Sequence, residues 1–227
     1  LATMALLPPF LQNLLGYPVV DVGLVMAPRG MGVMFSMLIV GKIAGKVDPR
    51  MQVGFGLLLT IFSLWEMTLF NTSITSWDIV RTSVVQGVGL GFIFVPLSAI
   101  AFASLEGRFR NEGTALFSLT RNIGSSIGIS VVMAELQQNI QRNHAAFADY
   151  ITPYNQALAK VGESGHWNIA TTQGLVAINN EVQRQAATLS YLQDFQLMMW
   201  VTIAALPLLL LLRKPQAGGA PVNIAAD

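Results

Sequence analysis

The chain has 227 residues, of which 53% are hydrophobic and 11% charged, and its formal net charge is +1. Soluble domains carry about a quarter charged residues, so this composition predicts a protein whose solvent is largely a lipid bilayer. The near-zero net charge gives no reason to expect nucleic-acid binding. The chain has no cysteine, which excludes disulfides, thiolate metal sites and cysteine nucleophiles; we expect no metal and no cofactor.

Six apolar segments alternate with polar turns. A transmembrane helix needs about 20 mostly apolar residues, and lipid offers no hydrogen-bond partner to a non-helical backbone. The sequence therefore predicts an all-α membrane protein with a six-helix bundle. The first segment, Leu1 to about Leu15, is short and follows no basic region or cleavage site, so we expect a fragment whose start lies upstream, not a signal peptide. The five complete spans are expected at 22–45, 52–70, 79–104, 113–135 and 195–212.

Basic residues mark alternate turns. The turns at 16–21 and 71–78 have no lysine or arginine. The basic residues of the other turns and of the chain end are Lys42, Lys46, Arg50, Arg108, Arg110, Arg213 and Lys214. Because short cytoplasmic loops collect lysine and arginine, we expect both ends of the chain to face the cytoplasm.

A polar insert separates the last two spans. We divide the chain into five helices (1–139), an extra-cytoplasmic insert (140–194), the last helix (195–213) and a disordered cytoplasmic tail (214–227). The insert contains both histidines, His144 and His166. In its second half, apolar residues recur at helical spacing and predict an amphipathic helix that packs on a partner or on the rest of the insert: Leu175, Ile178, Val182, Ala186 and Leu189.

Four ionisable residues stand out inside the predicted spans: Arg29, Glu66, Arg81 and Arg121. Each costs about 2.5–3.5 kcal/mol on insertion scales, and such residues are functional hypotheses by default. Glu66 lies at a depth comparable with Arg29 and Arg81, so a carboxylate–guanidinium pair would offset most of the desolvation cost. Three interpretations are open: a structural pair that fixes helix register, a pair that breaks when an outer gate moves, or a Glu66 that reaches water.

A polar stripe surrounds Arg121. Residues at spacings of three and four place small or polar side chains on one helix face: Thr114, Ser118, Arg121, Ser125 and Gly128. Small residues also let membrane helices approach closely. The stripe therefore indicates either helix packing, with the arginine bonded to a carbonyl, or a cavity-lining arginine that meets substrate or a carboxylate of another helix.

The fourth span is interrupted by Gln86, by three glycines and by Pro96. Glycine and proline loosen and bend a helix, as a moving gate requires. We therefore expect Arg29, Gln86 and Arg121 to line or gate a substrate cavity, together with Ser118 and Ser125 of the polar stripe.

Residues 124–128 match the G-x-S-x-G pattern of serine hydrolases. A nucleophilic serine needs a base within hydrogen-bond reach, but both histidines lie in the insert and no lysine lies inside a span. The sequence therefore argues against an enzyme, and Ser126→Ala is expected to leave function largely intact.

Arg29 and Arg121 occupy similar places in the second and the fifth span, and each is followed by glycines. These spans are the middle helices of two successive triplets that cross the membrane in opposite directions. Transporters often contain such inverted three-helix repeats, so the pattern favours a six-helix half built from two of them.

Three motifs in this order resemble the C-terminal half of major facilitator superfamily drug:proton antiporters of the fourteen-span, EmrB/QacA-like type: PRGMG (28–32), GKIAGKVDPR (41–50) and RNIGSSIG (121–128). The resemblance covers nearly the whole chain. Members of that superfamily carry a loop G-x-x-x-D-R-x-G-R, in which Gly41, Lys46 and Arg50 match the glycine and two basic positions. Gly45 stands where the family has aspartate and Asp48 is displaced, so an ion pair of the usual form is not expected.

The resemblance implies proton-coupled efflux of drugs or other amphipathic small molecules by alternating access against a missing N-terminal half. It places the chain in the cytoplasmic (inner) membrane of a bacterium, with the proton gradient as energy source, and implies contact between 140–194 and a periplasmic adaptor protein. Glu66 is the one carboxylate expected within a span, and we expect the acidic residues that couple protons to lie mostly in the missing half. A metabolite transporter on the same scaffold and a non-transporting scaffold that presents 140–194 remain alternatives.

Overall fold

The structure, a computed structural model, describes residues 2–43, 45–102, 109–151 and 171–211. All regular elements in these ranges are helices, which confirms the all-α prediction. They are α1 (Ala2–Asn13), α2 (Val19–Ile43), α3 (Pro49–Thr68), α4 (Ser76–Phe102), α5 (Arg110–Ala148), α7 (Thr172–Ala205) and the 3₁₀ helix η2 (Pro207–Leu211).

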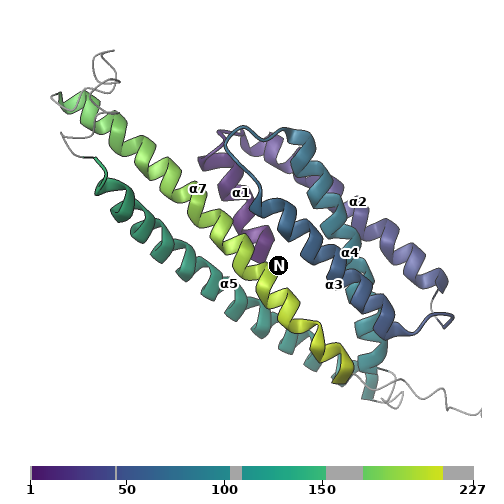
Figure 1. The fold of residues 1–227 in the computed structure, drawn as a ribbon. Helices are drawn as coiled ribbons and strands as arrows, with labels where there is room; N and C mark the ends of the chain where they lie inside the picture. Colours follow the sequence, from purple (N-terminus) through teal and green to yellow (C-terminus); the bar gives the residue numbers. More distant parts are fainter. Residues whose placement is uncertain (1, 44, 103–108, 152–170, 212–227) are drawn as a thin grey trace, which may run out of the picture.

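The helices form two groups that meet along α3 and α7 (Figure 1). In the first group, α4 packs against both α2 and α3. In the second, the long helices α5 and α7 run side by side in opposite directions and extend beyond the other helices at one end (Figure 1). The short helix α1 contacts α2, α5 and α7, so it bridges the two groups.

Glycines allow the first group to pack closely. A Cβ on Gly56 of α3 would lie 2.6 Å from the carbonyl oxygen of Gly89 of α4, and a Cβ on Gly87 of α4 would collide with the carbonyl oxygen of Arg29 of α2. Backbones in such contact leave no room for a side chain. The fourth-span glycines, which the sequence suggested as flexible gate residues, thus serve as contact points between helices.

An aromatic cluster joins the two groups. The Phe10 ring of α1 lies 5.4 Å from the Tyr191 ring and 6.1 Å from the Phe195 ring of α7, measured between centroids, and 6.3 Å from the Phe70 ring after α3. Phe10 and Phe195 are fully buried. Because aromatic side chains bury large apolar areas, this cluster is the centre of the hydrophobic core.

Among the described residues, four segments are long and apolar enough to cross a membrane: Val19–Ile43, Pro49–Thr68, Ser76–Phe102 and Thr172–Leu209. They contain or closely overlap four of the five complete spans that the sequence predicted. Helix α5 includes the remaining one, 113–135, but its polar stripe keeps it below the hydropathy of the others. Helix α1, with 12 residues, is too short to cross a bilayer.

The predicted insert boundaries fall inside helices. Helix α5 continues through position 139 to Ala148, and α7 begins at Thr172 and continues through position 194. Asn143 donates to the side chains of Ser190 (2.9 Å) and Gln193 (3.1 Å), and these bonds hold the two helices together beyond the main bundle. Polar residues therefore continue both helices here instead of ending them. The centre of the insert with His166 (152–170) and the tail (214–227) lie outside the described residues.

The buried face of α7 differs in part from the predicted one. Ile178 and Ala186 are buried as the helical spacing indicated, whereas Leu175 and Leu189 are 46% and 37% exposed. The buried side chains of α7 continue to Phe195, whose ring packs against Phe10 and Phe70.

Candidate functional site

A cavity of about 410 Å³ lies between the two helix groups, and each of the six α-helices contributes to its wall. Most of the lining side chains are apolar, and the polar exceptions are Thr3, Arg29, Thr60, Gln86 and Thr202. The apolar part of the wall consists of Ala2, Leu64, Leu90, Gly128, Val131, Val132, Leu197, Met198 and Val201. An apolar cavity with few polar groups is the usual form of a small-molecule site.

Arg29 places a positive charge in this cavity. The side chain is on α2, 3% exposed, and its Nη2 donates to the hydroxyl of Thr3 at a long distance of 3.5 Å. Nε and Nη1 have no hydrogen-bond partner among the described residues. A buried guanidinium with two free donors has strong affinity for an anion, since a charge-assisted hydrogen bond is about twice as strong as a neutral one.

Gln86 of α4 is the second predicted residue that the structure places in the cavity wall. It is 2% exposed, and its Oε1 has no hydrogen-bond partner in the described part of the chain. Arg29 and Gln86 thus offer free donors and a free acceptor in otherwise apolar surroundings. That combination can orient a molecule with one polar end and one apolar end.

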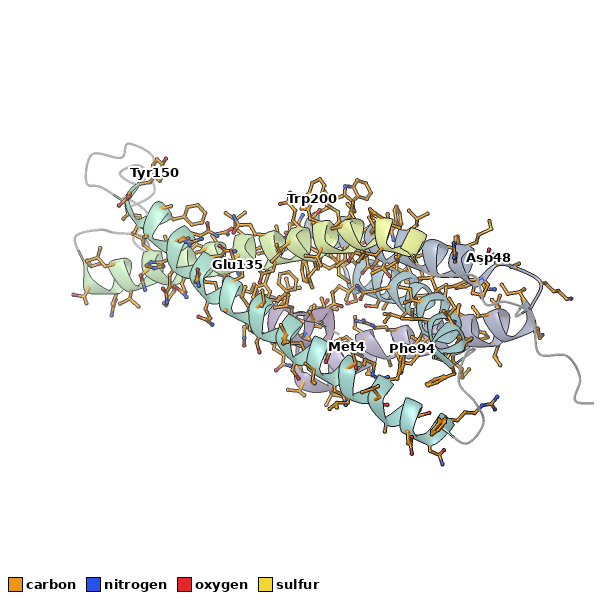
Figure 2. All side chains as sticks on the ribbon, turned by 90° about the horizontal axis from the view of Figure 1, so that it is seen from below. Met4, Asp48, Phe94, Glu135, Tyr150 and Trp200 are labelled. Carbon is orange, nitrogen blue, oxygen red and sulfur yellow. The ribbon has the colours of Figure 1, made fainter. Side chains whose placement is uncertain are left out.

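The structure does not bring Arg121, Ser118 and Ser125 into the cavity wall. Arg121 is exposed, and its guanidinium carbon lies 5.1 Å from the centroid of the Phe94 ring, a cation–π contact between α5 and α4. Figure 2 labels Phe94 on α4. Of the polar stripe, Gly128 lines the cavity.

Glu66 and Arg81 form an ion pair at a separate place. The Arg81 Nη2 donates to Glu66 Oε1 at 2.6 Å, with the Arg81 side chain 55% exposed and the Glu66 side chain 11% exposed. The pair lines a polar hollow of about 450 Å³ with Trp65 and Asp78. Of the two arginines that the sequence offered to Glu66, the structure therefore pairs it with Arg81.

The basic loop between α2 and α3 turns at Gly45, the residue that departs from the family motif. Gly45 has φ +84°, in the left-handed region that glycine adopts without strain. Asp48 then caps α3, since its Oδ1 accepts from the Arg50 amide at 3.1 Å and Pro49 occupies the first helical turn. Gly41 and Lys46 are exposed.

The G-x-S-x-G segment has no base beside it in the described residues. His144 Nε2 lies 3.2 Å from Asn179 Oδ1, at the far end of the α5–α7 pair, and is therefore remote from Ser126. Within the described ranges, no group of three or more histidine, aspartate or glutamate side chains could hold a metal ion.

The sequence did not identify one buried carboxylate. Asp194 is 0% exposed, yet it was assigned to the polar insert because the predicted last span began one residue later. The helical spacing of Tyr191, Asp194 and Phe195, all buried, was the signal that could have found it. Its burial shows that this part of α7 belongs to the core.

The sequence profile of the Major Facilitator Superfamily matches residues 1–129. The chain therefore belongs to this superfamily, whose members are membrane transporters and not enzymes. Together with the apolar helices, the match defines an integral membrane protein. The expected resemblance to drug:proton antiporters is confirmed at the level of the family and its efflux relatives.

Several curated relatives align with most of this chain. It is 28% identical to the fatty acid resistance protein FarB of Neisseria gonorrhoeae over 96% of its own length and 43% of the relative. It is 25% identical to the probable multidrug resistance protein EmrY of Escherichia coli (93% of this chain, 42% of the relative) and 25% identical to the multidrug export protein EmrB of Escherichia coli (79% and 38%). The chain thus spans about two fifths of the length of these relatives.

Proposed function

We propose that the chain forms the C-terminal half of a proton-driven exporter of amphipathic small molecules, and that Arg29 binds the anionic end of such molecules. The efflux relatives support the export class, since their names describe multidrug export and fatty acid resistance. The observation that carries the proposal is the cavity of about 410 Å³ in which an apolar wall surrounds the free nitrogens of Arg29.

The chemistry of the cavity favours an amphipathic anion. An alkyl chain would fill the wall formed by residues such as Leu64, Val132 and Met198, while its charged head would meet Arg29. Burial of the apolar chain contributes about 25 cal/mol per Å². The Arg29 contact adds specificity, because a neutral molecule would leave the buried charge without a partner.

The test uses the full-length transporter and a radiolabelled long-chain alkyl sulfonate, whose charge does not titrate. Arg29→Met should weaken sulfonate binding about tenfold or more, since a hydrogen bond to a charged group contributes about 1.5–3 kcal/mol. The control Arg184→Met removes an arginine that is 46% exposed on α7 and paired with Glu181. Unchanged sulfonate affinity in Arg29→Met would refute the role of Arg29. An alcohol of equal chain length leaves the Arg29 charge unpaired, so it should bind no more weakly to Arg29→Met than to the control.

Proton drive and alternating access form the second part of the proposal. In this mechanism the described bundle rocks against the N-terminal half in the bacterial inner membrane, with both ends of this chain in the cytoplasm. Reconstituted full-length protein should move the alkyl sulfonate against its gradient when a pH gradient is imposed. Transport that is unaffected when an ionophore removes that gradient would contradict proton drive.

We also propose that the distal part of the α5–α7 pair contacts a periplasmic adaptor protein. Figure 2 shows Tyr150 at the far end of this pair, opposite the end of the molecule that carries Asp48. Val176 and Leu175 are 54% and 46% exposed there, so apolar surface is available for a partner. Val176→Glu should weaken co-purification of the adaptor, whereas Gln183→Glu, at an exposed polar position of the same helix, should not. Equal co-purification of both would refute this contact.

A further inference from the structure

Asp194 is buried with little compensation from the described residues. It lies on α7 at the end of the apolar run, is 0% exposed, and neither carboxylate oxygen accepts a hydrogen bond of standard geometry from the described residues. The neighbouring Tyr191 and Phe195 are 6% and 0% exposed, and both belong to the aromatic cluster. The carboxyl group is therefore shielded from water by the tightest part of the core.

The polar groups that face Asp194 do not include a cation that bonds to it. Glu135 of α5 lies close enough for the two carboxylates to repel each other, and the Asn139 side chain lies where it can donate to the Asp194 carboxylate, which offsets part of that repulsion. On α7 itself, the Tyr191 hydroxyl also interacts electrostatically with the Asp194 carboxylate. Figure 2 labels Glu135 on the stretch of α5 that lies alongside α7.

The other helices near this position supply no free counter-ion. Helix α1 has no ionisable side chain between Ala2 and Asn13. Helix α3 has Arg50, at its far end, and Glu66, which accepts from Arg81 of α4. Arg29 of α2 donates to Thr3 and not to Asp194.

An ionised carboxylate in such a place is strongly disfavoured. Burial without a partner destabilises the charged form, and a second carboxylate nearby destabilises it further. Glu135, by contrast, is only half-buried. The packing around Asp194 therefore suits a neutral carboxyl group better than an ionised one.

We propose that Asp194 is a proton-binding residue of the transporter and that Glu135 passes the proton between Asp194 and water. This role rests on the proposed function, in which a pH gradient drives export. Loss of the proton leaves a carboxylate that must gain water or a hydrogen-bond donor, which requires α5 and α7 to separate locally. No other bond forms or breaks.

The position of Asp194 links this event to the cavity. Leu197, Met198 and Val201 follow at spacings of three, four and seven residues, so they lie on the same face of α7 as Asp194 and line the cavity. A local movement of α7 that hydrates Asp194 therefore also displaces the cavity wall that would hold the substrate. The proton and the substrate would thus act on one helix.

Infrared spectroscopy of the purified full-length protein tests the proton site without any transport. A carbonyl-stretch band of a protonated carboxylic acid, which shifts in deuterated water, should disappear in Asp194→Asn and persist in the control Glu181→Gln. Glu181 is on the same helix, with its side chain 32% exposed and paired with Arg184. A band that is unchanged in Asp194→Asn would overturn the proposal. Since asparagine resembles the neutral acid, this variant should fold normally.

Transport then separates this inference from the proposed function. In liposomes, Asp194→Asn should lose accumulation of the alkyl sulfonate driven by a pH gradient, yet retain exchange of labelled for unlabelled sulfonate at equal pH. Gradient-driven accumulation at the wild-type level in Asp194→Asn would overturn the proposal. If wild-type protein moves no sulfonate at all, the proposed function fails, while the infrared band still decides whether Asp194 holds a proton.

Discussion

The contact between α2 and α4 at Gly87 can be tested with a single methyl group. A Cβ at this position would overlap the backbone carbonyl oxygen of Arg29, and a backbone atom cannot rotate away as a flexible side chain could. Gly87→Ala therefore has to push the two helices apart. Overpacking of this kind costs about 1–3 kcal/mol, against a gain of up to about 1 kcal/mol from the higher helix propensity of alanine. We expect a net loss of stability.

Two matched variants separate the effect of the helix contact at Gly87 from the effect of the helix propensity of alanine. A Cβ on Gly30 of α2, one residue after Arg29, or on Gly124 of α5 meets no atom within 4 Å. Gly30→Ala and Gly124→Ala should leave thermal stability unchanged or raise it slightly, whereas Gly87→Ala should lower it. The assay is thermal unfolding of the purified full-length protein in detergent. If all three variants unfold at the same temperature, the close helix contact does not exist as described.

Three further predictions concern single interactions, each read out by unfolding of the full-length protein. Asp48→Ala should lower stability by about 1 kcal/mol because α3 loses its N-terminal cap, and no loss would argue against the cap. A double-mutant cycle over Glu66 and Arg81 should give a coupling energy below about 1 kcal/mol, since Arg81 is 55% exposed; a coupling of several kcal/mol would mean that the pair is buried in the complete protein. Arg121→Ala should lower stability by no more than about 0.5–1 kcal/mol, the value of an exposed cation–π contact with Phe94. If the arginine has the transport role that the sequence indicates, the same variant should also abolish export. Full export would favour a packing role.

The apolar spans could be predicted well because their signal is local. A run of about 20 apolar residues has few alternatives in a bilayer, and the spans expected at 22–45, 52–70 and 79–104 correspond to α2, α3 and α4 within a few residues. Helix α3 begins at Pro49, directly after its N-cap Asp48, where the basic turn ends.

The extent of α5 and α7 could not be predicted from hydropathy. Both helices continue into polar sequence, where bonds between side chains such as Asn143 and Ser190 replace apolar contacts. The boundary expected at position 194 matters for the site, because the carboxylate that it places in the polar insert is buried in the structure. Polarity indicates solvent for a residue only when the helix that carries it has no partner along that face.

Two candidate site residues that look equivalent in the sequence differ in burial in the structure. Arg29 and Arg121 have similar neighbours in the sequence, but one is 3% exposed and lines the cavity, while the other is exposed and covers Phe94. Which face of a helix meets its own bundle depends on contacts between distant segments, and no local motif encodes it. The inverted-repeat pattern therefore predicts equivalent positions in the chain without predicting equivalent surroundings.

The division of the bundle into two groups gives the proposed coupling a physical basis. Close backbone contacts at Gly56 and Gly87 make α2, α3 and α4 one stiff unit, which carries Arg29 and Gln86. Helices α5 and α7 form the other unit, which carries Asp194. The cavity lies between the two units, so a relative movement of the units changes its shape. In the proposal, deprotonation of Asp194 separates α5 from α7 locally, and α7 carries part of the cavity wall. In the proposed mechanism, protonation of Asp194 favours the closed packing seen here, and the repulsion that follows deprotonation favours separation. The energy of the proton gradient would in this way act directly on the wall of the substrate cavity.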